Sequence, residues 1–265
     1  EFCERLVAGA AKGQQLPFRY FSAHRAVKAV ANVSGKVLDA VEACLMASLG
    51  NLPKLGGRVM SLCDNSGSAR GATTSSMGTM AVATIANLTG LLAGLCGDEG
   101  EVGVFGDALK THAVRRAASV MDQLEALERL GNTVGGGTEN GIWLFWDRAI
   151  RERQMWDHVF VFSDMQAGHG GLYGVNAQDY KDYRWGSTQY IDVPKLVATY
   201  RERVNPKVNV YLVQVAGYQD TLLPEFYERT YILGGWGEGL PRFAAEMAGL
   251  ADAPPVPSQR GASAA

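Results

Sequence analysis

Short apolar runs alternate with longer amphipathic segments along most of the chain, and this alternation predicts a sheet flanked by helices. Apolar runs typical of buried strands lie at 58–63, 101–106, 158–163 and 207–216, with weaker candidates at 109–114 and 229–233. Apolar residues at helical spacing predict helices at 77–96, 115–130, 140–153, 193–203 and 238–249. Because strands that alternate with helices usually pair in parallel, we expect an α/β domain with a doubly wound, mostly parallel six-stranded sheet and helices on both faces.

Two further segments flank this predicted domain, which we place at residues 58–250. Residues 1–57 predict a helical lead-in, because 23–31 and 37–48 carry apolar residues at helical spacing. Residues 251–265 are rich in Pro, Ala and Ser, a composition typical of a disordered tail. The chain begins without Met inside a charged, helical-looking stretch, which favours a fragment of a longer protein.

Composition is that of an ordinary globular protein, with 265 residues, 47% hydrophobic and 20% charged, and a net charge of −2. This charge argues against a stand-alone nucleic-acid binder, although it does not exclude a local basic patch. Cys63 and Cys96 lie in apolar surroundings without metal-site spacing, so we expect buried thiols and a cytoplasmic location. We expect no membrane span, because the longest apolar candidate, 77–95, is interrupted by Gly, Thr and Asn.

Candidate chemistry begins where the first predicted strand ends. Asp64, Ser66 and Ser68 place one carboxylate and two hydroxyls on alternate residues of the loop that follows. Three hard oxygens at the carboxyl end of a strand suit a small divalent cation with open coordination positions. The pattern has little specificity by itself, because Asp, Ser and Gly are common in turns.

Two later segments add specificity to this pattern. Thr138 follows a glycine run, and Asp164 ends a later apolar strand. The order of the segments resembles the metal-ion-dependent adhesion site of von Willebrand factor A domains, in which three such loops meet at the top of one sheet. The resemblance implies that Asp64, Ser66 and Ser68 bind the metal directly. It also implies that Thr138 binds directly or through water, and that Asp164 binds directly or lies just behind the ligands.

Further segments are similar to the carboxy-terminal A domain of the Ro autoantigen proteins, the TROVE family. The similarity covers roughly residues 16–250 and includes the lead-in at 16–27, the passage at 51–53, the strand at 208–213 and the Gly-Gly-Trp at 234–236. In that family a ring of helical repeats binds small non-coding RNAs, and the A domain joins the two ends of the ring. No such ring is recognisable in this sequence. The resemblance therefore implies a longer parent protein that contacts RNA, and it assigns RNA binding to none of these residues.

The ligand types favour Mg²⁺ as the metal. Hydroxyl and carboxylate oxygens together with waters suit its octahedral coordination, and Mn²⁺ should substitute. Ca²⁺ prefers more carboxylate oxygens, and Zn²⁺ prefers His or Cys. We expect no enzymatic activity, because no histidine lies in a triad context with Ser66 or Ser68 and a hydrolase would lack its general base.

Three interpretations of function remain open. The bound Mg²⁺ would capture a Glu or Asp carboxylate of a protein partner, or it would capture RNA phosphate, or the domain would be a structural clasp with an empty metal site. Tyr183, Arg184 and Trp185 are candidates for contacting a partner, with a solvated insertion as the alternative. The aromatic and basic segment at 18–25 would touch RNA or the ring, or would pack on its own domain. Glu139 would support the metal or cap the helix that follows Thr138.

Overall fold

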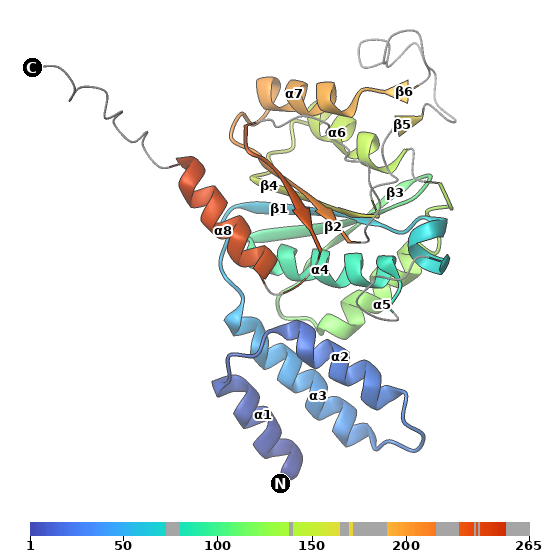
Figure 1. Cartoon of the computed structure of the whole chain (residues 1–265), viewed down its shortest axis with the longest axis vertical. Coiled ribbons are helices and arrows are strands. Elements are labelled where there is room, and N and C mark those ends of the chain that lie inside the picture. The colour runs from blue at the N-terminus through green and yellow to red at the C-terminus, as the bar shows by residue number, and fades with distance from the viewer. Residues whose placement is uncertain are drawn as a thin grey trace, which may run out of the picture.

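A six-stranded sheet forms the centre of the computed structural model, which describes residues 1–72, 80–137, 140–164, 170–171, 190–215, 228–235, 237 and 239–252. The strand order is β3-β2-β1-β4-β7-β8 (Figure 1). The strands are β1 (Arg58–Asp64), β2 (Glu99–Phe105), β3 (Leu109–Ala113), β4 (His158–Ser163), β7 (Asn209–Gln214) and β8 (Thr230–Gly234). Neighbouring strands are parallel except β2 and β3, which form an antiparallel hairpin. A separate antiparallel pair consists of β5 (Gly170–Gly171) and β6 (Tyr190–Ile191).

Both faces of the sheet are covered by helices, as the layers in Figure 1 show. The helices of the domain are α4 (Val82–Cys96), α5 (Val120–Gly131), α6 (Gly141–Arg151), α7 (Val193–Arg203) and α8 (Gly239–Asp252). Val59 and Cys63 of β1 pack in one core cluster with α4, α5 and α8. Met60 and Leu62 point to the opposite face and pack in a second cluster with α6 and α7. The predicted fold class, a doubly wound and mostly parallel α/β sheet, is therefore confirmed.

The lead-in consists of α1 (Phe2–Lys12), α2 (Pro17–Lys28), α3 (Gly35–Ser48) and the 3₁₀ turn η1 (Leu49–Asn51), and it lies below α4 and α5 in Figure 1. The helix expected at 23–31 spans 17–28 instead, because Pro17 is well suited to the first helical position. Phe18 and Phe21 are buried in the core cluster that contains α4 and α5. The aromatic part of this segment thus packs on its own domain.

Other elements differ from the expected boundaries at their ends. The helix expected at 115–130 begins only at Val120, because the Ser119 hydroxyl caps it by accepting a hydrogen bond from the Asp122 N–H at 3.1 Å. Helix α8 continues to Asp252, two residues into the segment expected to be a tail, and 253–265 lie outside the described residues. Within the described residues, every helix is too short or too polar to span a bilayer.

Candidate metal centre

The sheet topology brings the predicted metal segments to one edge. Strands β1 and β4 are parallel neighbours in which Cys63 pairs with Phe162, so Asp64, the last residue of β1, and Asp164, directly after β4, lie at the same edge. The glycine run before Thr138 also reaches this edge. The Gly67 N–H donates a hydrogen bond to the Gly136 carbonyl at 2.9 Å.

The Asp64 carboxylate is fully buried and accepts hydrogen bonds on both oxygens. Oδ1 accepts from the Ser66 N–H at 2.9 Å, and Oδ2 accepts from the Ser163 hydroxyl at 2.8 Å. Ser163 was not among the predicted site residues. Its only sequence signal is its position at the end of β4, directly before Asp164. The two bonds hold Asp64 in one orientation at the end of β1.

The two serine hydroxyls of the loop lie side by side. Ser66 Oγ and Ser68 Oγ are 3.2 Å apart, with Ser66 buried and Ser68 half-buried. Oxygens in neighbouring positions around an octahedral Mg²⁺ lie about 3.0 Å apart, because each lies about 2.1 Å from the ion. The spacing therefore fits two neighbouring ligands of one small cation.

Electrostatics at this edge disfavour the charged form of Asp64. Burial raises the pKa of Asp64 to about 6, and the negative charge of Asp164 adds to the rise, while hydrogen bonds from Ser66 and Ser163 partly oppose it. No lysine or arginine is among the groups that shift this pKa. A bound cation would offset both the lost hydration and the repulsion between the carboxylates. The donor set also fits, because a small divalent cation prefers hard oxygen ligands.

Among the described residues, no group of three or more His, Cys, Asp or Glu side chains is placed so that it could hold a metal ion. The candidate ligands that the structure brings together are thus the carboxylates of Asp64 and Asp164 and the hydroxyls of Ser66 and Ser68. Thr138 and Glu139 lie outside the described residues, as do Tyr183, Arg184 and Trp185. The metal role of Thr138 and the partner role of the other three stay predictions.

Asn65, between the first two candidate ligands, anchors the loop to the helices behind it. Its amide forms a reciprocal pair with the Asn87 amide of α4, with bonds of 2.9 and 3.2 Å between buried groups. Helix α4 can approach β1 closely because Gly90 lacks a side chain, and a Cβ there would overlap the Cys63 sulfur. A Cβ at Gly131 of α5 would likewise overlap the Asn65 side chain. Sequence reasoning missed this pair because its members lie 22 residues apart and neither belongs to the motif.

Arg70 connects the first metal loop to the glycine run. It lies in the π-helical turn η2 (Ser68–Ala72), and its Nη2 donates a hydrogen bond to the Gly135 carbonyl at 2.8 Å. Its Nε donates to the Ser66 carbonyl at 3.4 Å. The side chain therefore fixes the distance between two loops that the motif places at the metal.

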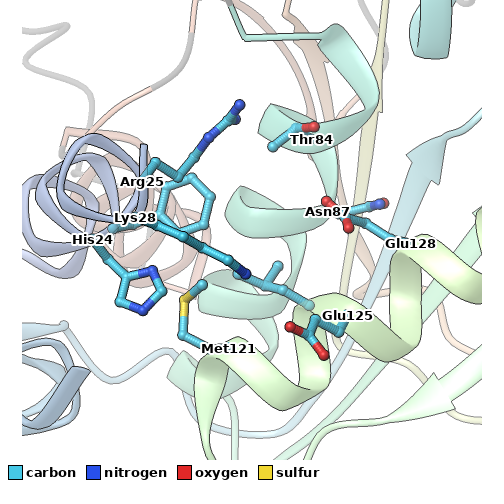
Figure 2. A pocket seen from close by; sticks show the side chains of 10 residues that line it. His24, Arg25, Lys28, Thr84, Asn87, Met121, Glu125 and Glu128 are labelled. Carbon is cyan, nitrogen blue, oxygen red and sulfur yellow. The ribbon is translucent and has the colours of Figure 1, made fainter. Parts of the chain in front are cut away.

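Two adjoining cavities lie beside this framework. The first, of about 210 Å³, is lined by residues of α2, α4 and α5, and Lys28 of α2 points across it toward Glu125 of α5 (Figure 2). The second, of about 230 Å³, shares lining residues with the first and extends to the metal loop; its lining includes Asn65, Arg70, Thr84, Asn87 and Glu128. The two cavities share Thr84, Asn87 and Glu128, and together they reach from the lead-in to the residues that support the loop.

Comparison with known proteins identifies the fold. No family model matches the sequence, and no curated protein matches it. The solved structure of the Ro (RSR) protein of Deinococcus radiodurans is similar, with a TM-score of 0.65 and 14% sequence identity. The chain has a Ro-like von Willebrand factor A fold. The likeness covers 93% of this chain but 47% of the other, so the chain spans about half the length of the Ro protein it matches. At this identity the likeness concerns the fold alone.

Proposed function

We propose that this domain is a non-enzymatic binding module that holds Mg²⁺ at the carboxyl edge of its sheet and captures an acidic group of a protein partner. The buried Asp64 carboxylate carries the proposal, because burial and Asp164 disfavour its charge and the loop that follows it holds two hydroxyls 3.2 Å apart. A structural carboxylate in such a place is expected to pair with a cation or to stay protonated.

The residues of the first loop would hold the ion. Asp64, Ser66 and Ser68 supply one negative charge and two neutral oxygens, while Asp164 lies close enough to act electrostatically on Asp64. A divalent ion held mainly by neutral ligands keeps part of its positive charge and some open coordination positions. When bound, it supplies a site for an anionic oxygen such as a Glu or Asp carboxylate. Mn²⁺ has similar preferences and would substitute.

The proposal also concerns the larger protein to which this domain would belong. We place the domain in a Ro-like RNA-binding protein of the cytoplasm, where small non-coding RNA would be bound through the parent rather than through this edge. The fold likeness to the Ro protein supports this setting. The chain carries a net charge of −2, which suits a protein ligand better than an extended RNA contact.

Calorimetric titration of Mg²⁺ and Mn²⁺ into the purified protein tests the metal site. We expect saturable binding that Asp64→Asn and Asp64→Ala abolish and Asp164→Ala weakens. Asp39→Ala, which removes an exposed carboxylate of α3, is the matched control and should bind as the wild type does. Acidic peptides should then bind only in the presence of metal.

Other outcomes would favour the other interpretations. A wild-type protein that binds neither ion contradicts the proposal and favours the structural clasp. Metal-dependent binding of RNA that weakens steeply with salt would favour phosphate as the captured group.

A further inference from the structure

The glycine run that leads into Thr138 is held from one side by a carboxylate outside the metal motif. Asp107 accepts the Gly136 N–H on Oδ2 at 2.9 Å and the Gly137 N–H on Oδ1 at 3.1 Å. Both oxygens of one carboxylate thus accept hydrogen bonds from successive backbone N–H groups. Such charge-assisted bonds are stronger than those between neutral groups.

The carbonyl groups of the same peptide units bind the first metal loop. The Gly135 carbonyl accepts a hydrogen bond from Arg70 Nη2 at 2.8 Å, and the Gly136 carbonyl accepts one from the Gly67 N–H at 2.9 Å. Two consecutive peptide planes therefore have their N–H groups bound to Asp107 and their C=O groups bound to the loop that carries Ser66 and Ser68. Four hydrogen bonds fix the rotation of both planes.

Glycine at position 135 is required by this arrangement. Gly135 has φ +87°, in the left-handed region, and a Cβ there would overlap the Asp107 carboxylate. Only glycine combines that backbone conformation with such a close approach of the carboxylate. The glycine run therefore has a specific structural function here, in addition to allowing a tight turn.

Asp107 itself is held in place by the β2–β3 hairpin. Within the turn, the Gly106 N–H donates to the Ala108 carbonyl at 3.0 Å. The Ala108 N–H donates to the Val134 carbonyl at 2.9 Å, which ties the turn to the residue before the glycine run. The flanking Phe105 and Leu109 pair in the antiparallel register of the two strands. A carboxylate on this turn can impose its position on the glycine run, because the turn is tied to the sheet.

We infer that Asp107 is a positioning residue of the metal centre, which fixes the glycine run against the loop that carries Ser66 and Ser68 without binding the ion. The inference rests on the proposed function, because it concerns the same ion. Its consequence is that metal affinity depends on a residue in the β2–β3 turn, outside the three segments of the motif.

Asp107→Asn tests this inference against a matched control at the other end of β1. There Asp157 Oδ2 accepts the Arg58 N–H at 2.7 Å beside Gly57, which also has positive φ. Asp157→Asn thus removes a similar carboxylate–backbone bond far from the metal segments. Loss of groups that orient metal ligands typically lowers metal affinity 10- to 100-fold, so we expect about a tenfold or larger loss of Mg²⁺ affinity in Asp107→Asn. We expect the Mg²⁺ affinity of Asp157→Asn to stay within about twofold of the wild-type value, since Asp157 contacts none of the groups that position the metal segments.

A spectroscopic measurement without metal separately tests the hydrogen bonds from the glycine run to Asp107. In Asp107→Asn the amide hydrogens of Gly136 and Gly137 should exchange with solvent faster and shift upfield in NMR spectra, while Asp157→Asn leaves both unchanged. Gly135→Ala should change the Gly136 and Gly137 amide hydrogens in the same way, because it alters the glycine run instead of the carboxylate. Combining it with Asp107→Asn should cause little further loss of Mg²⁺ affinity.

Each outcome bears on the inference. Wild-type metal affinity in Asp107→Asn, or unchanged Gly136 and Gly137 amides, would overturn it while the proposed function stands. A wild-type protein that binds no metal would overturn the proposed function, and the role of Asp107 toward the ion with it.

Discussion

Carboxylates at the two edges of the central sheet differ in their burial and in their partners. At the amino edge, Asp98 Oδ2 accepts the Gly57 N–H at 2.8 Å, and Asp157 Oδ2 accepts the Arg58 N–H at 2.7 Å. The Arg58 guanidinium also forms an ion pair with Glu99 at 3.0 Å and lies over the Trp156 ring at 4.4 Å. Of these carboxylates, those of Asp98 and Glu99 are exposed and that of Asp157 is half-buried.

At the carboxyl edge, Asp64 is fully buried, and its partners are a backbone N–H and a hydroxyl. Asp164 adds a second buried negative charge nearby, and the pKa of Asp64 rises to about 6. The comparison shows that the surroundings of a carboxylate decide its role. An aspartate beside a backbone N–H at the surface stabilises the fold, whereas a buried aspartate without a cation is suited to bind one.

The largest expected effect comes from removing the charge at the carboxyl edge. Asp64→Asn should abolish Mg²⁺ binding and raise the metal-free free energy of unfolding at pH 7 by about 1–3 kcal/mol, since a pKa raised by about two units corresponds to about 3 kcal/mol. Urea unfolding with and without Mg²⁺ checks both effects. A metal-free variant less stable than the wild type would show that the charge of Asp64 stabilises the fold.

The next effect is a pH dependence of opposite sign for metal binding and metal-free stability. Because the folded pKa of Asp64 is about 6 against 3.8 for the exposed group, protonation favours the folded state. The contribution of Asp64 to metal-free stability is full below about pH 3.8 and is lost as the pH rises through about 6.

Mg²⁺ affinity should instead fall as the pH drops from 7 to 5, because the ion competes with the proton. Unfolding and calorimetry at pH 5, 6 and 7 check the two trends. Asp64→Asn is the control and should flatten the part of the stability profile that Asp64 causes. Equal Mg²⁺ affinity at pH 5 and pH 7 would contradict a direct role of Asp64.

A smaller effect should follow from breaking the amide pair behind the first loop. Asn87→Ala leaves the buried Asn65 amide without its side-chain partner and should lower stability by about 1–3 kcal/mol. It should also weaken metal binding, because the loop loses its anchor to α4. Thr84→Ala, on the same helix and lining the same cavities, is the control and should change little. Chemical denaturation and calorimetry on the two variants separate the anchor from a general effect on α4.

The smallest effect is expected at the amino edge. Glu99→Gln removes the ion pair with Arg58, whose side chains are 40% and 71% exposed for Arg58 and Glu99, so solvent screens it strongly. Stability should fall by at most about 0.5 kcal/mol and less in high salt, with Mg²⁺ affinity unchanged. A change in metal affinity would contradict the separation of the two edges.

Local pattern was sufficient to predict the elements of the sheet. The apolar run at 158–163 coincides with β4, and the run at 58–63 ends one residue before β1 does. Strand periodicity and burial depend on neighbouring residues, so they can be recognised in the sequence. Helix starts were less predictable, because Pro17 and the Ser119 cap act through backbone geometry rather than through apolar spacing.

The sequence by itself determined the fold class and the order of the predicted metal segments, because both follow from local apolar pattern and from a short motif at the end of β1. Only the tertiary structure decided which groups support those segments: Ser163 on Asp64, Asn87 on Asn65, and Asp107 on the glycine run. The sequence motif assigned Asp107 no role, since its contact depends on β2 lying beside β1 in the sheet. Such contacts join residues that are distant in the chain, and their geometry exists only after the strands have taken their order.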